Sequence, residues 1–274
     1  MNTIGVFDSG FGGLTVLRAL LAQAPSARYV YLGDTARLPY GSKSHETIAR
    51  YAVSSAKFLA AQGAELLVIA CNTATALALD DIRSALPIPV VGVIQPGAEA
   101  ALHAGSGVPA SQQVLVLATA ATTQSGAYTR ALHALGLRAT EKACPLLVPL
   151  VEEGWIDSPT HSAVTLEVLR IYLLEALAQA PDASTLLLGC THYPLLKPHF
   201  EATLRNLHHP MCIIDSAAAT ASTVAALMPT ATQPASATPD CEFYATDSIE
   251  KFQRLGSAFL GRPLPAVQLI DLGG

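Results

Sequence analysis

Two short apolar runs end in a cysteine that is followed by small hydrogen-bonding residues. Residues 66–70 lead into Cys71-Asn72-Thr73, and residues 186–189 lead into Cys190-Thr191-His192. A buried parallel strand that delivers polar groups at its carboxyl end has this pattern. A helix that begins directly after a cysteine lowers the thiol pKa and favours the thiolate. The repeated arrangement therefore predicts a pair of reactive thiols.

The alternative for each cysteine is an inert core position, because free cysteine is among the most buried residue types. We interpret Cys144, Cys212 and Cys241 in this way, since they lie within apolar or strand-like runs. The count of five cysteines is odd and includes no C-x-x-C spacing. A disulfide framework or a structural zinc site is therefore not expected.

A glycine-rich turn, Asp8-Ser9-Gly10-Phe11-Gly12-Gly13, follows the first predicted strand. A dinucleotide-binding motif would need Gly or Ala at position 15, where Thr15 stands. A phosphotransferase Asp-x-Asp motif would need a second aspartate at position 10, which is a glycine. Two interpretations of Asp8 remain: it is a simple helix cap, or it is a carboxylate that assists a thiolate.

Apolar runs and helical spacing alternate along the whole chain, which predicts an α/β protein with mostly parallel sheets. Residues 95–97, Gln-Pro-Gly, are expected to separate two similar lobes. Ligands of such folds bind beyond the carboxyl ends of the strands, so facing lobes would place Cys71 and Cys190 on one cleft. Residues 229–239, rich in Pro, Ala and Thr, are expected to form an exposed, mobile loop. The expected strands are 3–7, 28–32, 66–70, 90–94, 114–118, 138–141, 186–189, 211–214 and 241–246, and the expected helices are 14–21, 44–61, 72–86, 119–135, 158–178, 194–207, 216–227 and 249–260.

The composition limits the classes of ligand. The chain has 274 residues, of which 51% are hydrophobic and 14% charged, with a net charge of −5. No run of Lys or Arg is present, so nucleic acid and anionic membranes are not the expected partners. No apolar run approaches the roughly 18 residues of a membrane span, and residues 1–8 lack the features of a signal peptide. We expect a cytoplasmic protein.

Taken together, these segments resemble the glutamate racemases of the aspartate/glutamate racemase family. The motifs follow the family order over nearly the whole chain, and the Asp-Ser-Gly, Cys-Asn-Thr-Ala and Gly-Cys-Thr-His-Tyr-Pro segments are specific in combination. The resemblance is carried by Gly5-Val-Phe-Asp-Ser-Gly-Phe-Gly-Gly-Leu-Thr-Val16, Gly33-Asp34, Leu38-Pro-Tyr-Gly41, Ala70-Cys-Asn-Thr-Ala74, Cys144-Pro145, Pro149-Leu-Val-Glu-Glu-Gly154, Gly189-Cys-Thr-His-Tyr-Pro194 and Asp215-Ser-Ala217.

The resemblance implies a racemase that needs no cofactor and no metal and supplies D-glutamate for peptidoglycan. It implies that 1–96 and 213–274 form the first lobe and 97–212 the second, with the active site in the cleft between them. Glutamate is the expected partner and a homodimer the expected assembly. The implied catalytic residues are Cys71, Cys190, Asp8, His192 and Glu152, and the implied substrate-binding residues are Asp8, Ser9, Tyr40, Gly41, Asn72, Thr73, Thr119, Thr122, Thr191 and His192.

Racemisation removes the α-proton from one face of the substrate and returns a proton to the other, which two opposed thiols can do. By resemblance, Cys71 acts on D-glutamate and Cys190 on L-glutamate, with Asp8 assisting the first thiol and His192 and Glu152 the second. Taken singly, Tyr40-Gly41 is equally compatible with an ordinary turn, His192 with a helix start and Glu152 with a solvated helix end.

Three alternatives remain open. An aspartate racemase would use the same chemistry, because pocket length cannot be read from the sequence. A hydrolase could use Cys190 as nucleophile and His192 as base, although an i, i+2 pair seldom aligns for this and Cys71 would have no role. A binding or regulatory protein could keep the fold without catalysis.

Overall fold

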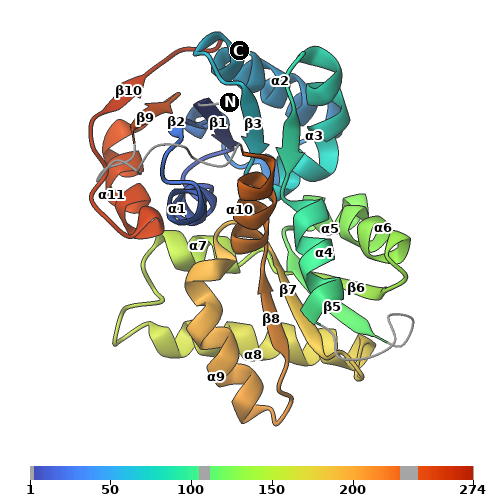
Figure 1. The fold of residues 1–274 in the computed structure, drawn as a ribbon. Coiled ribbons are helices and arrows are strands. Elements are labelled where there is room, and N and C mark those ends of the chain that lie inside the picture. The colour runs from blue at the N-terminus through green and yellow to red at the C-terminus, as the bar shows by residue number, and fades with distance from the viewer. Residues whose placement is uncertain (1–2, 105–111, 229–239, 274) are drawn as a thin grey trace. The chain divides into compact units, whose positions relative to one another are not determined.

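The structure is a computed structural model that describes residues 3–104, 112–228 and 240–273. The chain divides into two compact units. Unit 1 comprises Met1–Val93 and Ala217–Gly274, and unit 2 comprises Ile94–Ser216. The boundaries expected from the sequence, after residue 96 and before residue 213, lie within four residues of this division. The expected loop at 229–239 falls outside the described residues. Figure 1 draws the chain as a ribbon and labels elements of each unit where there is room.

Unit 1 is built on a six-stranded parallel sheet with the order β10-β9-β2-β1-β3-β4. All residues of β1 and β3 are buried, which is why these strands are continuous apolar runs rather than alternating ones. The predicted parallel sheet of the first lobe is confirmed. Its strands are β1 (Thr3–Asp8), β2 (Arg28–Gly33), β3 (Leu66–Ile69), β4 (Val90–Gly92), β9 (Cys241–Ala245) and β10 (Val267–Leu269).

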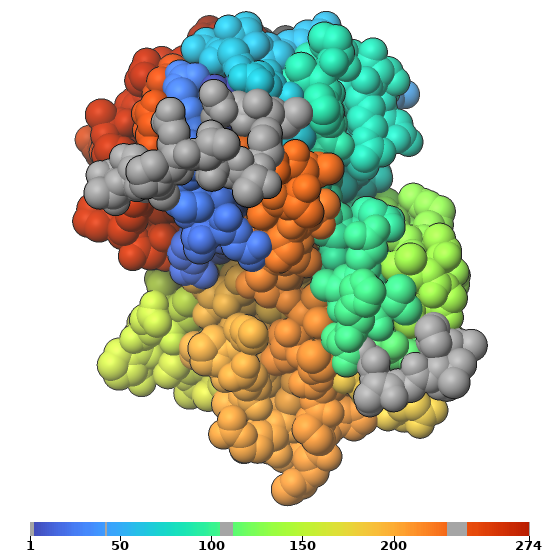
Figure 2. Space-filling view, viewed as in Figure 1, coloured from blue at the N-terminus to red at the C-terminus, as the bar shows by residue number. Residues whose placement is uncertain are grey.

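Helices cover the faces of this sheet. Ser44 caps α2 by accepting a hydrogen bond from the Thr47 backbone N–H at 3.4 Å. Helices α2 and α3 pack against each other, and their surfaces adjoin in the space-filling view (Figure 2). The helices of unit 1 are α1 (Leu14–Gln23), α2 (His45–Ala61), α3 (Asn72–Ala85), α10 (Ser216–Leu227, whose first residue belongs to unit 2) and α11 (Ile249–Leu260), with the 3₁₀ turns η1 (Thr35–Arg37) and η2 (Tyr40–Ser42).

The C-terminal segment returns to complete unit 1. Strand β9 pairs in parallel with β2, and Tyr31 lies opposite Phe243 in this register. The Arg28 guanidinium pairs with the Glu242 carboxylate at 2.5 Å at the start of the same two strands. Phe252 of α11 packs on Tyr31, with ring centroids 6.0 Å apart. Residues from both ends of the chain therefore share one core.

Unit 2 has a four-stranded parallel sheet with the order β6-β5-β7-β8, which confirms the parallel sheet predicted for the second lobe. Strands β5 and β7 are buried throughout, whereas β6 is only partly covered. Its elements are α4 (Ile94–Ala104), β5 (Gln113–Ala118), α5 (Ala120–Ser125), α6 (Ala127–Ala134), β6 (Arg138–Ala143), α7 (Leu147–Glu152), α8 (Ser162–Gln179), β7 (Thr185–Gly189), η4 (Tyr193–Leu196), α9 (Lys197–Asn206) and β8 (Cys212–Asp215).

Residues 95–97, expected to separate the lobes, lie in the first turn of α4, directly after the division between the units at Val93 and Ile94, and a proline in that turn has no hydrogen bond to lose. One local prediction is wrong. The helix expected over 119–135 is broken into α5 and α6 by Gly126, whose φ of 63° ends the first helix and starts the second. Helices α4 and α7 and strand β10 were not predicted at all.

The two long helices, α2 and α8, carry charged residues along their lengths. No helix within the described residues is both long enough and apolar enough to cross a membrane.

Candidate active site

Cys71 stands where β3 gives way to α3. It is the N-cap residue of α3, and its sulfur accepts a hydrogen bond from the Ala74 backbone N–H at 3.4 Å. The thiol also lies 3.4 Å from the Ser9 hydroxyl oxygen, to which it donates. Cys71 is 6% exposed, so the thiol is sheltered at the carboxyl edge of the sheet. The structure thus brings together two residues that the sequence assigned to the site.

The turn after β1 holds Ser9 in place. Asp8 is 2% exposed, and its Oδ2 atom accepts a hydrogen bond from the Gly10 backbone N–H at 2.8 Å. A Cβ atom at Gly13 would lie 2.5 Å from the Asp8 Cβ. Only a glycine at position 13 therefore allows α1 to start this close to the Asp8 carboxylate.

Tyr40 and Gly41 belong to η2. The Tyr40 side chain is 1% exposed, and its hydroxyl donates to Asp34 Oδ2 at 2.6 Å. Burial, together with the negative charge of Asp34, raises the pKa of Tyr40 well above its usual value. The hydroxyl proton is committed to Asp34, so backbone groups are what this turn can offer to a ligand. Asn72 and Thr73, buried in the first turn of α3, complete the predicted site residues of unit 1.

Cys190 occupies the equivalent position in unit 2, directly after β7. Its sulfur lies 3.9 Å from His192 Nδ1, and the Thr191 hydroxyl lies 3.4 Å from the same nitrogen. Cys190 is 5% exposed and His192 9% exposed. The predicted contact between this thiol and the imidazole two residues later is therefore present.

Glu152, the last residue of α7, reaches the other side of the imidazole. Its Oε1 atom lies 3.1 Å from His192 Nε2. Burial by itself lowers the pKa of His192, but the hydrogen bonds to Cys190 and Glu152 and their negative charges outweigh this and raise it to about 10. His192 is therefore protonated at neutral pH and presents a positive charge to Cys190.

Thr119 and Thr122 follow the strand next to Cys190. In the pairing of β5 with β7, Ala118 lies opposite Gly189, so Thr119 and Cys190 come directly after paired residues. Thr119 caps α5 by accepting from the Thr122 backbone N–H at 3.4 Å, and the two hydroxyl oxygens lie 3.0 Å apart. These hydroxyls stand at the same edge of the sheet as the thiol.

The remaining three cysteines differ in their exposure to solvent. Cys144 is fully buried, and burial raises its pKa to about 12. Cys241 is partly buried, and burial raises its pKa to about 11. Cys212 is exposed at the first position of β8, so the expectation of a core position is wrong for it.

Sequence reasoning missed the roles of three residues that support the site, namely Tyr31, Tyr193 and Asp34. The Tyr31 hydroxyl donates to the Gly10 carbonyl at 3.0 Å, and the Tyr193 hydroxyl donates to the Cys144 carbonyl at 2.9 Å. Asp34 was noticed only as part of a motif, without a role. The spacing of these residues in the sequence does not predict their contacts, because each partner lies in another element.

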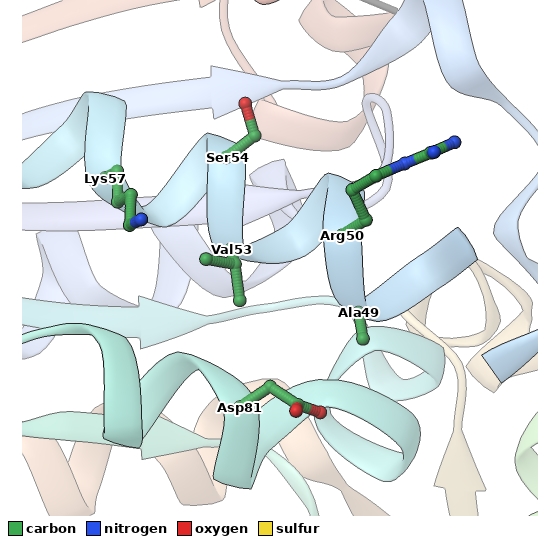
Figure 3. Close-up of a pocket in the computed structure, with 6 residues that line it drawn as sticks. All are labelled: Ala49, Arg50, Val53, Ser54, Lys57 and Asp81. Atoms are coloured by element: carbon green, nitrogen blue, oxygen red, sulfur yellow. The ribbon is translucent and has the colours of Figure 1, made fainter. Parts of the chain in front are cut away.

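Two surface cavities lie away from the cysteines. One, of about 500 Å³, is lined by Ala49, Arg50, Val53, Ser54 and Lys57 of α2 and by Asp81 of α3 (Figure 3). The other, of about 410 Å³, is lined by residues of α9 and the turn before β8. Neither contains a predicted site residue. Within the described ranges, no group of three or more His, Cys, Asp or Glu side chains is arranged to hold a metal ion.

Comparison with known families gives the class of protein. Residues 4–224 match the model of the Asp/Glu/hydantoin racemase family. A match over most of the chain, together with a thiol at the carboxyl edge of each sheet, places the chain in a family of isomerases: it belongs to the Asp/Glu/hydantoin racemases.

Within this family, the chain is similar to proteins called glutamate racemases. It is 48% identical to the glutamate racemase of Koribacter versatilis, covering 99% of this chain and 98% of that protein. It superimposes with a TM-score of 0.83 and 32% identity on the glutamate racemase of Francisella tularensis in complex with D-glutamate, covering 99% and 98% of the two chains. The Thermus thermophilus enzyme with beta-chloro-D-alanine gives a TM-score of 0.82 and 40% identity, covering 99% and 97%.

Proposed function

We propose that this protein interconverts L- and D-glutamate without a cofactor, by proton transfer at Cα between substrate and two cysteines. The observation that carries the proposal is the repeated local design: in each unit a thiol follows a buried parallel strand and contacts a polar partner. Cys71 contacts Ser9, and Cys190 contacts His192. The choice of glutamate rests on relatives at 41–48% identity that are called glutamate racemases.

In the proposed reaction, one cysteine is a thiolate and the other a thiol. Cys71 removes the α-proton of D-glutamate while Cys190 protonates the opposite face, and the roles reverse for L-glutamate. The proposal requires both thiols to reach the same Cα from opposite sides. Asp8 assists at Cys71. The His192 imidazolium, held by Glu152, stabilises the Cys190 thiolate when it forms.

The substrate's two carboxylates and its ammonium group need several donors and acceptors. We assign this role in unit 1 to Asp8, Ser9, Tyr40, Gly41, Asn72 and Thr73, and in unit 2 to Thr119, Thr122, Thr191 and His192. Helices α3 and α5 begin among these residues, so their N-terminal N–H groups add partial positive charge. Donors fixed before the reaction stabilise the charge that develops as the α-proton leaves.

Isotope exchange tests the proposal. Extensively dialysed protein in deuterated water should introduce deuterium at Cα of both glutamate enantiomers. The absence of exchange with either enantiomer would reject a racemase, and tight glutamate binding without exchange would favour a binding protein. Rates measured in parallel on glutamate and aspartate decide between the two substrates.

One further observation favours a second function. Cys190, His192 and Glu152 form a chain of contacts of 3.9 and 3.1 Å, which is also the arrangement of a thiol hydrolase. A covalent adduct on Cys190, detected by mass spectrometry after incubation with amides or esters, would support hydrolysis. Hydrolysis leaves the Cys71–Ser9 contact without a role, and we therefore place racemisation first.

We further propose that the protein supplies D-glutamate for peptidoglycan in the cytoplasm and acts as a homodimer. If cells depleted of the gene need added D-glutamate to grow, the role in supplying D-glutamate is supported. Light scattering on the purified protein measures its oligomeric state, and a monomeric mass at assay concentrations would overturn the homodimer.

A further inference from the structure

Asp34 carries a buried carboxylate for which the proposed reaction has no role. It follows β2 and is fully buried. Its Oδ2 atom accepts hydrogen bonds from the Tyr40 hydroxyl at 2.6 Å and from Arg37 Nη1 at 3.3 Å. Its Oδ1 atom accepts from the Thr246 hydroxyl at 3.0 Å. A buried charge with three donors holds those donors in fixed positions, because leaving any of them unpaired is costly.

Thr246 comes from the C-terminal segment, directly after β9. Besides donating to Asp34, its hydroxyl oxygen accepts from the Ala36 backbone N–H at 2.9 Å. The next residue, Asp247, donates its backbone N–H to the Thr35 hydroxyl at 2.9 Å. The residues after β9 and the residues after β2 are therefore joined side by side at the carboxyl edge of the sheet.

Leu38, the first residue of the segment 38–41, contacts the turn that carries Ser9. A Cβ atom at Gly10 would lie 3.0 Å from Leu38 Cδ1, so the Leu38 side chain packs directly on this glycine. The Tyr40 ring packs against Phe7, with centroids 6.2 Å apart. Gly10 follows Ser9, whose hydroxyl contacts Cys71. Contacts thus run without interruption from Thr246 through Asp34 to the first thiol.

We propose that Asp34 and Thr246 are positioning residues that hold the segment 38–41 beside Ser9 and Cys71, so that its backbone groups bind the substrate. This proposal rests on the proposed function and adds to it a contribution of the C-terminal segment to the site. Substrate-binding groups lose effectiveness when they are displaced by even about 1 Å. Loosening the segment should therefore weaken binding of glutamate while the proton-transfer groups stay in place.

Steady-state kinetics of Thr246→Val test the proposal, because valine keeps the shape of threonine and lacks its hydroxyl. We expect KM for glutamate to rise about five- to tenfold while kcat stays within about twofold. Thr246→Ser, which restores the hydroxyl, should return KM to near the original value. Thr223→Val in α10 is the matched control, since that hydroxyl donates to the Ala219 carbonyl in its own helix. Its KM should not change.

An unchanged KM in Thr246→Val, or a loss confined to kcat, would overturn the positioning role. If Thr246→Val does not stay folded at the assay temperature, Tyr40→Phe removes the other hydroxyl bonded to Asp34 and must show the same rise in KM. Deuterium exchange by the unmodified protein is measured first. A lack of exchange there would reject the proposed function, whereas an active parent with an unchanged Thr246→Val KM would reject only the positioning role.

Discussion

His192 Nε2 lies 3.1 Å from Oε1 of Glu152, and the two residues are 11% and 17% exposed at their side chains. The same imidazole contacts Cys190 through Nδ1. Each nitrogen of the ring thus has an acidic partner, which is why its pKa rises to about 10 despite burial. The contribution of this charged contact to stability is full below the ordinary histidine pKa of about 6.5 and is lost as the pH rises through about 10.

Replacing Glu152 by glutamine should lower the pKa of His192, because one of the two negative partners becomes neutral. NMR titration of the His192 ring protons measures the change directly. The alkaline limb of the pH profile of kcat/KM should move to lower pH in the same variant. Glu167→Gln, which removes the partner of Arg170 on the surface of α8, is the control and should leave His192 unchanged. Identical His192 titrations in Glu152→Gln and the parent would contradict this assignment.

Replacing either Cys71 or Cys190 by serine should lower kcat for racemisation by about 100-fold or more, since each removes one of the two proton-transfer groups. Cys212→Ser, at an exposed position, should be nearly silent. Circular dichroism followed at a wavelength where the enantiomers differ gives the rate in both directions. Full activity in either of the first two variants would refute the two-base scheme.

Gly13→Ala should destabilise unit 1 by about 1–3 kcal/mol, because the added methyl group would overlap Asp8 and Ala70. Urea unfolding measures the change. Gly97→Ala is the matched control: its nearest neighbour would be the Ser216 Cβ at an ordinary 3.4 Å, and alanine favours the helix. That variant should be neutral or slightly stabilising. Equal free energies of unfolding for the two variants would contradict the close contact between position 13 and Asp8.

Tyr193→Phe should destabilise unit 2 by about 0.5–1.5 kcal/mol, because the buried hydroxyl contact with the Cys144 carbonyl is lost, although that carbonyl still accepts from the Leu147 backbone N–H at 3.2 Å. Thermal unfolding of the variant gives the loss. Tyr172→Phe serves for comparison, since its hydroxyl accepts from the Leu146 backbone N–H at an exposed position and should matter less. A larger loss for Tyr172→Phe than for Tyr193→Phe would be inconsistent with the buried contact.

The positions of the two thiols could be predicted from the sequence because they depend on local patterns. A fully buried parallel strand is a continuous apolar run, and the residue after it stands at the carboxyl edge of the sheet. This reasoning located Cys71, Cys190 and Asp8. It failed for Cys212, because an apolar run at an edge strand does not tell which of its ends is exposed. It also did not predict α4, because Pro and Gly at residues 95–97 are as compatible with a first helical turn as with a loop.

Contacts between elements could not be predicted, because no local pattern encodes them. Glu152 meets His192 through the packing of unit 2, although 40 residues separate them. The Tyr40 hydroxyl donates to Asp34, a contact that the position of Tyr40 in a predicted turn does not indicate. Family resemblance alone implied that the C-terminal segment joins the first lobe, and its pairing with β2 was not predicted, since pairing order in a parallel sheet is not visible in composition or periodicity.

The return of the chain to β2 has a consequence for biosynthesis. On the ribosome, unit 2 is a continuous stretch whose synthesis is complete once Ser216 has been added. Unit 1 must wait, because β2 has no β9 beside it until Ala245 is synthesised. During that interval its core strands present an open edge, which is where unfinished chains associate wrongly. Premature termination after β8 would therefore leave a foldable unit 2 attached to an incomplete unit 1 that lacks Thr246.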